Sequence, residues 1–548
     1  MSNPQKINGF LYAKMIQAGT ANLRAHAQEI NDLNVFPIPD GDTGDNMLLT
    51  IVGGAQAAGE GTDSLSETAK KVSDGMLLSA RGNSGVILSQ IFEGISKGLE
   101  NIPDADTNEI VCALKEGVKQ AYDAVMQPTE GTMLTVVRCA TEHVSEEEQS
   151  NPESLMSSFV DEAKHTLDKT PDMLPVLKKA GVVDSGGAGL ICIFEGMLGA
   201  LRGEDVADTQ EFLPANSSEQ VLDLDKFDEN SVLEFGYCTE LLVRLQRAKT
   251  DIENFDVNVV TDYLSSVGDS VAAVKNGSIL KIHVHTMTPD KVLSFCQQYG
   301  EFLKIKIENM SLQHNNTSSD EPEVSETHEA EQKDFAVVAV ASGDGVKQLF
   351  LEHGCDIIVD GGQSMNPSTE DFLEAFRKAN AKTIFVFPNN GNILLSAKQA
   401  AGMYEKSDVR VIESRTIGAG YAALTMYSPD CGDADTIEEE LREAMNGVVT
   451  AEVSKSIRDT DEVHAGDYIG FVGKDILAST PKRLDAAKET VEKLGISMYD
   501  ICIVIYGKDT DGAEAEEFEK HILSTYPGKE VYTISGMQDI YDYIIILE

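Results

Sequence analysis

Residues 311–334 form the segment that most limits how this chain can fold. The segment carries seven Asp or Glu residues against one Lys and has almost no large apolar side chain. Closely spaced carboxylates repel one another, and so little apolar surface cannot offset the conformational entropy lost on folding. We therefore predict an acidic, flexible linker over 311–334. The chain of 548 residues is long enough for about three or four domains at roughly 150 residues each.

The first third of the chain has the hydrophobic pattern of helices. Apolar side chains such as Ile7, Leu11 and Met15 recur at helical spacing, and the alternation typical of strands is scarce up to about Gly203. This pattern predicts an all-α domain over 1–205.

The pattern changes from about Val221. Stretches such as "EFGYCTELLVRL" and "SILKIHVHT" are typical of strands, and "NFDVNVVTDYLSSVG" between them is typical of a helix. The dipeptide Asn276-Gly277 lies between two apolar runs, which is a strong hairpin signal. We predict a small α/β domain over 220–310.

Residues 335–548 alternate buried-type strands with helices. Segments such as "DFAVVAVA", "DIIVD", "TIFVF" and "VRVI" each run into a polar or glycine-rich loop. This is the pattern of a doubly wound parallel α/β domain, whose ligand or partner surface lies at the carboxyl ends of the strands. The sequence leaves open whether the part from about Val449 onward is a separate unit.

Composition excludes several classes of function. The formal net charge is −47, whereas binding to DNA or RNA requires clustered Lys and Arg, so we expect no nucleic-acid partner. The sequence contains no uninterrupted run of ~18 apolar residues, so we predict no membrane span. The eight Cys form no CxxC pairs and the N-terminus lacks a signal-peptide pattern, so we expect a cytoplasmic protein.

Four loops in the helical third are candidates for binding phosphate. They read "PDGDTGDN" (39–46), "ARGNSGVILSQ" (80–90), "PTEGTMLTVV" (128–137) and "GVVDSGGAGL" (181–190), and each lies between helical segments. Glycine lets backbone approach a phosphate closely, and helix N-termini attract anions. One such loop alone is most often a turn, but four in one helical domain favour an anion site.

The first of these loops packs Asp40, Asp42 and Asp45 into six positions. Carboxylates this close repel one another unless a counter-charge is present, so a metal cation is one explanation. A solvated acidic turn is the other, since Asp and Gly are ordinary turn residues. The spacing alone does not decide between them.

The four loops, in this order, resemble the DhaL-type nucleotide-binding domain of dihydroxyacetone kinases. The form "NVFPIPDGDTGDNM", followed by "RGNSGVILSQ", "EGTMLTV" and "VVDSGGAGL", is more similar to the catalytic component of bacterial fatty acid kinase. The resemblance covers essentially the whole chain, including a DegV-like C-terminal part. It implies a helical barrel that binds ATP and Mg²⁺. It also implies phosphorylation of a fatty acid carboxylate, presented by a separate fatty-acid-binding protein of DegV fold, to give an acyl phosphate for phospholipid synthesis.

The resemblance also implies roles for individual residues. Asp40 and Asp42 match the aspartates that hold Mg²⁺ and are the expected catalytic residues, while Asp45 is interpreted as surface charge. The family carries a further Asp about five residues earlier, where this chain has Asn34, so Asn34 or water would supply the third ligand. Nucleotide-binding residues would be Thr43, Asn46, Gly82, Asn83, Ser84, Gly85, Thr132, Met133, Asp184, Ser185 and Gly186, although Met133 is equally well explained as a core methionine.

A second constellation is Cys238 with His283 and His285. On a strand, the i,i+2 spacing of the two His places them on one face, and a thiol from a neighbouring strand would complete three ligands suited to Zn²⁺. Solvated or core histidines are the alternative from the residues alone, and the resemblance favours zinc. Because a fatty carboxylate is already ionised at neutral pH, we expect the zinc to be structural or positioning, with no histidine base.

Two other functions stay open from the sequence. One is a dihydroxyacetone-type small-molecule kinase, which the additional domains argue against. The other is a non-catalytic, nucleotide-sensing adaptor that binds the lipid carrier. For the fatty acid kinase, the strand-end loops "DGGQSMNPST" and "FPNNGN" are the expected carrier-docking surface, and a homodimer remains open.

Overall fold

The computed structural model resolves the chain into two compact units. One unit contains residues 1–210 together with 330–548, and the other contains residues 211–329. Among the described residues, no helix is long and apolar enough to cross a membrane. The residues described are 5–34, 41–125, 127–146, 149–204, 237–247, 249–252, 255, 257–276, 278–309, 332–362, 365–429, 432–456 and 463–548.

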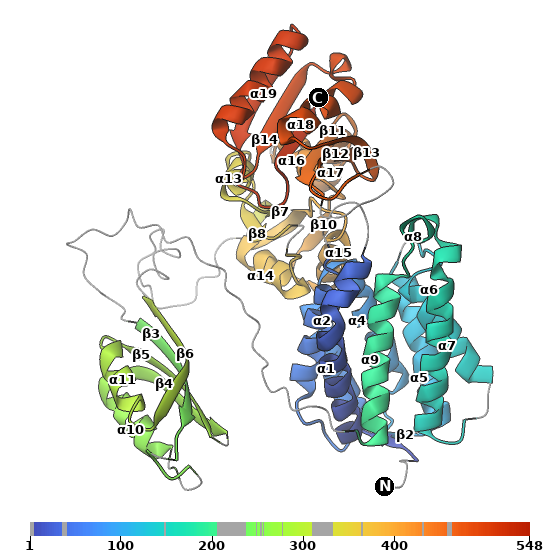
Figure 1. The fold of residues 1–548 in the computed structure, drawn as a ribbon, viewed down its shortest axis with the longest axis vertical. Helices are drawn as coiled ribbons and strands as arrows, with labels where there is room; N and C mark the ends of the chain where they lie inside the picture. Colours follow the sequence, from blue (N-terminus) through green and yellow to red (C-terminus); the bar gives the residue numbers. More distant parts are fainter. Residues whose placement is uncertain are drawn as a thin grey trace. The chain divides into compact units, whose positions relative to one another are not determined.

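The N-terminal part is a closed ring of helices around one hydrophobic core (Figure 1). Each long helix packs against the next along the chain, α7 packs against α9, and α9 closes the ring on α1. The predicted all-α barrel is confirmed, apart from a two-residue strand pair, β1 (Ile7–Asn8) with β2 (Asp104–Ala105). The helices are α1 (Gly9–Leu33), α2 (Thr43–Ala58), α3 (Leu65–Ser79), α4 (Gly82–Gly98), α5 (Thr107–Asp123), α6 (Met133–Glu146), α7 (Pro152–Met173), α8 (Pro175–Ala180) and α9 (Ser185–Arg202).

The direction of these helices alternates around the ring. Consecutive helices joined by short connections run antiparallel, so every second helix begins at the same end of the ring. The helices α2, α4, α6 and α9 therefore start at one end, which we call the rim, where α8 also lies (Figure 1). The strand β2 lies at the opposite end.

The C-terminal part contains two sheets that share a core. The first sheet is fully parallel, in the order β10-β9-β7-β8, as the strand and loop pattern predicted. Val337 and Phe385 of this sheet lie in the same buried cluster as Ile503 and Ile544 of the second sheet, so the two sheets are not separate units. The first sheet and its helices are β7 (Lys333–Ala341), α13 (Asp344–Glu352), β8 (Ile357–Asp360), α14 (Thr369–Ala379), β9 (Ala381–Phe387), α15 (Leu394–Met403) and β10 (Asp408–Val411).

The second sheet is mixed and has the order β13-β12-β11-β16-β14-β15. Its strands are β11 (Val449–Lys455), β12 (Tyr468–Val472), β13 (Asp475–Thr480), β14 (Ile501–Tyr506), β15 (Glu530–Ser535) and β16 (Tyr543–Leu547). The helices of this half are α16 (Ile417–Thr425), α17 (Ala434–Asn446), α18 (Arg483–Lys493), α19 (Gly512–Thr525) and the short η2 (Ile496–Met498).

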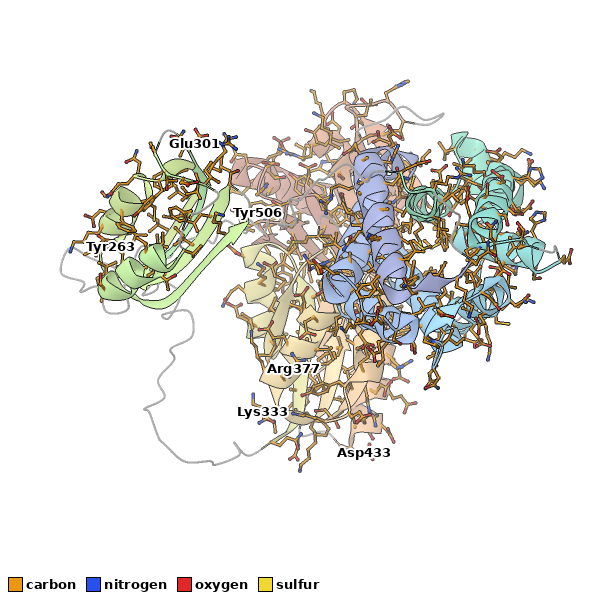
Figure 2. The ribbon with its side chains drawn as sticks, turned by 90° about the horizontal axis from the view of Figure 1, so that it is seen from below. Tyr263, Glu301, Lys333, Arg377, Asp433 and Tyr506 are labelled. Atoms are coloured by element: carbon orange, nitrogen blue, oxygen red, sulfur yellow. The ribbon has the colours of Figure 1, made fainter. Side chains whose placement is uncertain are left out.

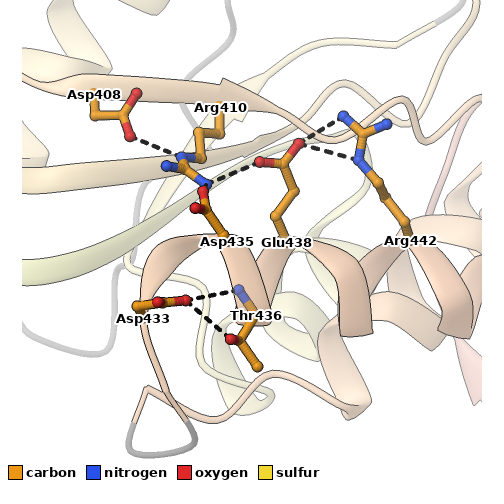
Figure 3. Close-up of polar contacts among 7 residues, drawn as sticks. All are labelled: Asp408, Arg410, Asp433, Asp435, Thr436, Glu438 and Arg442. Carbon is orange, nitrogen blue, oxygen red and sulfur yellow. Dashed lines mark hydrogen bonds and ion pairs between the residues drawn. The ribbon is translucent and has the colours of Figure 1, made fainter.

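An ion-pair network fixes α17 over the edge strand β10 (Figure 3). Arg410 on β10 pairs with Asp408 at 2.7 Å, with Asp435 at 2.6 Å and with Glu438 at 3.1 Å. Glu438 also pairs with Arg442 at 2.6 Å. Because the Arg410 side chain is only 20% exposed, this network is less screened by solvent than an ordinary surface pair.

One boundary of the predicted linker is wrong. Strand β7 begins at Lys333, two residues inside the segment predicted as linker over 311–334. Lys333, labelled in Figure 2, pairs with Asp356 at 2.8 Å. The first two residues of the strand are exposed and charged, whereas the strand is buried from Ala336 onward. Residues 311–331 of the predicted linker lie outside the described residues, and Gln332 directly precedes the strand.

The described residues of the middle unit form a four-stranded antiparallel sheet with two helices. Its strand order is β4-β5-β3-β6, and the β4–β5 pairing confirms the hairpin predicted at Asn276. Figure 2 labels Tyr263 on α10, whose ring stacks on Phe295 of α11 with centroids 3.7 Å apart. The elements are β3 (Tyr237–Leu245), α10 (Asn258–Val267), β4 (Asp269–Asn276), β5 (Ile279–Thr286), α11 (Pro289–Cys296) and β6 (Gly300–Asn309).

Candidate functional site

The rim gathers the described parts of all four predicted phosphate loops. The hydroxyl of Ser185, the first residue of α9, is 3.3 Å from the hydroxyl of Thr43, the first residue of α2. The carboxylate of Asp184 accepts hydrogen bonds from the N–H of Gly187 at 2.7 Å and from the N–H of Met133, the first residue of α6. These contacts link the starts of α2, α6 and α9.

The start of α4 joins the same cluster through Gly82. Gly82 has φ of +57°, and a Cβ on it would lie 2.6 Å from the side-chain amide nitrogen of Asn46. Only glycine fits there, because the left-handed backbone and the close amide both exclude a side chain. Four helix N-termini therefore meet at one place. Asn31 and Asp184 accept some of their first N–H groups, and the aligned N-terminal ends of the four helix dipoles favour binding of an anion.

Asp42 lies at the start of α2 and faces the C-terminal part of the chain. Its carboxylate makes no capping bond to its own helix, and it accepts a hydrogen bond of 2.5 Å from the side-chain amide of Asn366. Asp40, the other predicted Mg²⁺ ligand, lies outside the described residues. Asn34, considered as a third ligand, ends α1 and donates its backbone N–H to Asn31.

Asp45 occupies the position of a surface charge. It is exposed, and its carboxylate accepts from the side-chain amide of Asn31 at 2.9 Å. The oxygen of the same amide accepts from the backbone N–H of Gly44 at 2.7 Å. Asp45 and Asn31 therefore fasten the start of α2 to α1.

The remaining predicted residues line the rim at different depths. Asn83 and Ser84 lie half-buried in the first turn of α4, and Gly85 is buried against Thr50 of α2. The hydroxyl of Thr132 caps backbone locally by donating to Thr129 at 2.8 Å. Met133 is 3% exposed and belongs to the hydrophobic core, as its core interpretation predicted.

Asp184 is a titratable group of the rim whose pKa is shifted. Burial raises the pKa of Asp184 to about 6 from its ordinary value of 3.8, even though its two N–H donors act in the opposite direction. Its carboxylate caps α9, and its backbone N–H donates to the hydroxyl of Thr170 at 3.1 Å. Asp184 thus holds the loop before α9 in place.

The described residues fit a magnesium ion shared with nucleotide phosphates. Mg²⁺ in nucleotide sites is usually held by one or two carboxylates plus phosphate oxygens, and Asp42 supplies one carboxylate beside the helix N-termini. Across the part of the chain that the structure describes, no group of three or more His, Cys, Asp or Glu could hold a metal. A metal cage made of protein ligands alone is therefore not found among those residues.

The predicted zinc residues lie on two paired strands. Strands β3 and β5 pair antiparallel with Cys238 opposite His285 and Glu240 opposite His283. Directly opposite residues belong to the same face of a sheet, so the register is compatible with a shared site. The side chains of Cys238, His283 and His285 are outside what the structure describes, and the zinc site stays a prediction.

Sequence reasoning missed the residues that the C-terminal part brings to the rim. Asn366 contacts Asp42, and the side-chain amide of Asn83 donates to the side-chain oxygen of Asn392 at 3.2 Å. Both asparagines belong to the loops expected to bind a carrier protein, whereas their described parts contact the helical ring of the same chain. The only feature of the sequence that could have indicated this contact with the rim is the high content of Asn and Gly in these loops.

Family models match the chain in three consecutive segments. Residues 37–199 match the DAK2 domain, residues 234–317 match the middle domain of FakA-like fatty acid kinase proteins, and residues 336–548 match their C-terminal domain. Protein YloV of Bacillus subtilis is 39% identical over 555 residues and covers 99% of each chain. A protein of Staphylococcus saprophyticus is 36% identical over 558 residues, 99% of this chain and 100% of its own. The chain belongs to the FakA-like fatty acid kinase family.

Two solved structures are similar to parts of the chain. Dihydroxyacetone kinase from C. freundii, in complex with AMP-PNP and Mg²⁺, matches 53% of this chain and 55% of its own, with 12% identity and a TM-score of 0.31. DegV from Bacillus subtilis, a fatty acid binding protein, matches 39% of this chain and 99% of its own, with 14% identity and a TM-score of 0.31.

Proposed function

We propose that this protein uses ATP to phosphorylate the carboxylate of a fatty acid. A separate fatty-acid-binding protein of DegV fold presents the acid, and the product is an acyl phosphate for phospholipid synthesis. The observation that carries the proposal is the meeting of four helix N-termini beside Asp42, in a chain of the FakA-like fatty acid kinase family. Because the reaction consumes ATP, we assign it to the cytoplasm.

The rim supplies the two things that phosphoryl transfer needs most, which are positioning and charge neutralisation. Backbone N–H groups at Gly82, Asn83 and Ser84 hold phosphate oxygens, and Thr43 and Ser185 offer hydroxyls beside them. Asp40 and Asp42 hold the Mg²⁺ ion, which neutralises charge on the phosphates when bound. The carboxylate of the substrate is ionised at neutral pH, so the residues need not remove a proton from it.

The middle domain has a supporting role in this proposal. Cys238, His283 and His285 hold one Zn²⁺ ion that stabilises the sheet or positions a partner surface. The edge strand β6 exposes Leu303, Ile305 and Ile307 by 45%, 48% and 37%. These three residues alternate along the strand and therefore lie on one face of the sheet. Exposed apolar residues on a sheet face favour association, so we assign this face to a homodimer.

The experiment measures ATP consumption and acyl phosphate formation by the purified chain. Fatty acid and Mg²⁺ are supplied with and without a loaded DegV-fold fatty-acid-binding protein, and Asp42→Asn serves as the inactive control. We expect acyl phosphate only when the carrier is present. Turnover with dihydroxyacetone instead would favour the small-molecule kinase, and carrier binding without any turnover would favour the adaptor.

A further inference from the structure

Asn366 reaches the rim from a loop 324 residues away in sequence. It is 3% exposed, and its side-chain nitrogen lies 3.2 Å from the point where a Cβ on Gly82 would lie. The nitrogen, and not the oxygen, must face Asp42, because an ionised carboxylate only accepts hydrogen bonds. Asn366 thus connects Asp42 to the phosphate-facing turn of α4.

The loop that carries Asn366 is held firmly against the helical ring. Arg81, directly before α4, donates from its guanidinium to the backbone oxygen of Asn366 at 2.7 Å. The backbone of Arg81 also forms an isolated antiparallel bridge with Ser368. The N–H of Thr369 donates to the carbonyl of Ala80 at 3.1 Å. These contacts fix the backbone of the loop at the position from which the Asn366 side chain reaches Asp42.

The other end of the Asn366 amide has no partner among the described residues. Its side-chain oxygen is buried and accepts no hydrogen bond. A buried amide oxygen without a partner is unfavourable, so such atoms are retained where a bound water or ligand completes them. The amide nitrogen of Asn366 therefore donates to Asp42, and its oxygen is available to accept a hydrogen bond from a water or ligand in the site.

We propose that Asn366 is a positioning residue for Asp42, so that metal–nucleotide affinity at the rim depends on a side chain of the C-terminal part. The inference rests on the proposed function, since it assumes that Asp42 holds Mg²⁺. A carboxylate that ligates a metal is oriented by the hydrogen bonds of its second oxygen, and loss of such a partner typically weakens metal affinity or activity 10–100-fold. The kinase site is then built from two parts of one chain.

The test compares Asn366→Ala with Gln399→Ala. Gln399 on α15 makes contacts to the helical ring that avoid Asp42, donating to the carbonyl of Leu77 at 2.8 Å and accepting from Gln90 at 3.0 Å. Its removal therefore weakens docking of the same two parts without touching the carboxylate. Calorimetry measures the dissociation constant of AMP-PNP with Mg²⁺ and with EDTA, and circular dichroism checks the fold.

We expect Asn366→Ala to raise the Kd of Mg²⁺–AMP-PNP by about 10–100-fold and to leave the metal-free Kd unchanged. Gln399→Ala should change both by less than about twofold, and Asn366→Ala should add nothing to Asp42→Asn in the double variant. Equal losses in the two alanine variants, or a loss that persists in EDTA, would overturn the inference. If the unaltered protein binds no Mg²⁺–nucleotide at all, the proposed function itself falls.

Discussion

The rim of the helical ring and the sheet of the middle domain present their predicted ligands in opposite ways. The rim draws on loops from Asp42 to Gly186, and it also receives Asn366 from the C-terminal part. The middle domain draws on one pair of neighbouring strands, with Cys238 opposite His285. A site gathered by packing depends on the whole ring, whereas a site on one strand pair depends on local register. Damage to one should therefore leave the other intact.

The largest effect should come from the carboxylates of the rim. Asp42→Ala or Asp40→Ala removes a metal ligand, so acyl phosphate formation should be abolished, because phosphoryl transfer depends on charge neutralisation by the metal. The zinc content and the circular dichroism spectrum should not change. Turnover near the level of the unaltered protein in both variants would reject the Mg²⁺ assignment.

The next largest effect should come from the predicted zinc ligands of the middle domain. Replacing both His283 and His285 by Ala should remove about one equivalent of zinc per chain, because a single Cys cannot hold the ion. Elemental analysis of protein purified without a polyhistidine tag measures this. Nucleotide affinity at the rim should stay the same. Zinc that survives in the double variant would mean that the histidines are not its ligands.

Two glycines with the same backbone conformation test whether the turn before α4 contributes to nucleotide binding. Gly82 and Gly59 both have φ of +57°, but a Cβ on Gly59 would have no neighbour within 4 Å. Gly59→Ala should cost about 1–2 kcal/mol of stability from backbone strain alone. Gly82→Ala should cost more stability than this, because its Cβ would also lie 2.6 Å from the Asn46 amide nitrogen. It should raise the nucleotide Kd about tenfold or more, because the methyl group displaces Asn46.

Thermal unfolding and calorimetry distinguish these two outcomes. Equal nucleotide affinity in Gly82→Ala and Gly59→Ala would show that the turn before α4 is only structural.

The smallest effect concerns pH and Asp184. The folded protein binds the Asp184 proton more tightly than the unfolded chain, because burial raises the pKa to about 6 from 3.8. Stability from this group is therefore present at low pH and declines as pH rises from about 4 to about 6. Asp184→Asn keeps a capping oxygen but cannot titrate. Its stability relative to the unaltered protein should rise by about 1 kcal/mol across that range, a value reduced for partial exposure.

Unfolding midpoints of both proteins between pH 4 and pH 7 measure this difference. A difference that stays constant with pH would mean that Asp184 is not buried as a neutral acid.

Local patterns in the sequence were sufficient for most of the secondary structure. Helical periodicity predicted the ring, Asn276 predicted the hairpin, and the buried-type strands predicted the parallel sheet. The four loops come together because the helices alternate in direction, and this alternation follows from the order of the helices along the sequence. Lys333 was misassigned because a charged strand start has the composition of a linker.

The C-terminal contribution to the rim could not be predicted in this way. Asn366 lies in a polar loop beside Pro367, and such Asn-Pro pairs are ordinary turn residues. Its contact with Asp42 depends on how α14 and α15 pack against α3 and α4, which no spacing along the chain encodes. The sharing of one core by Val337 and Ile503 was also invisible, because both strands have the pattern of independent buried strands.

The alternating ring also offers a place for reporters. The connections that follow α2, α4 and α6 lie at the end of the ring opposite the rim, and α6 alone spans 14 residues, or about 21 Å. A fluorophore or spin label attached at the exposed Ser150 would be separated from the rim by that length of packed helix. Such a probe would report on the ring from the end opposite the rim, without touching the residues of the rim.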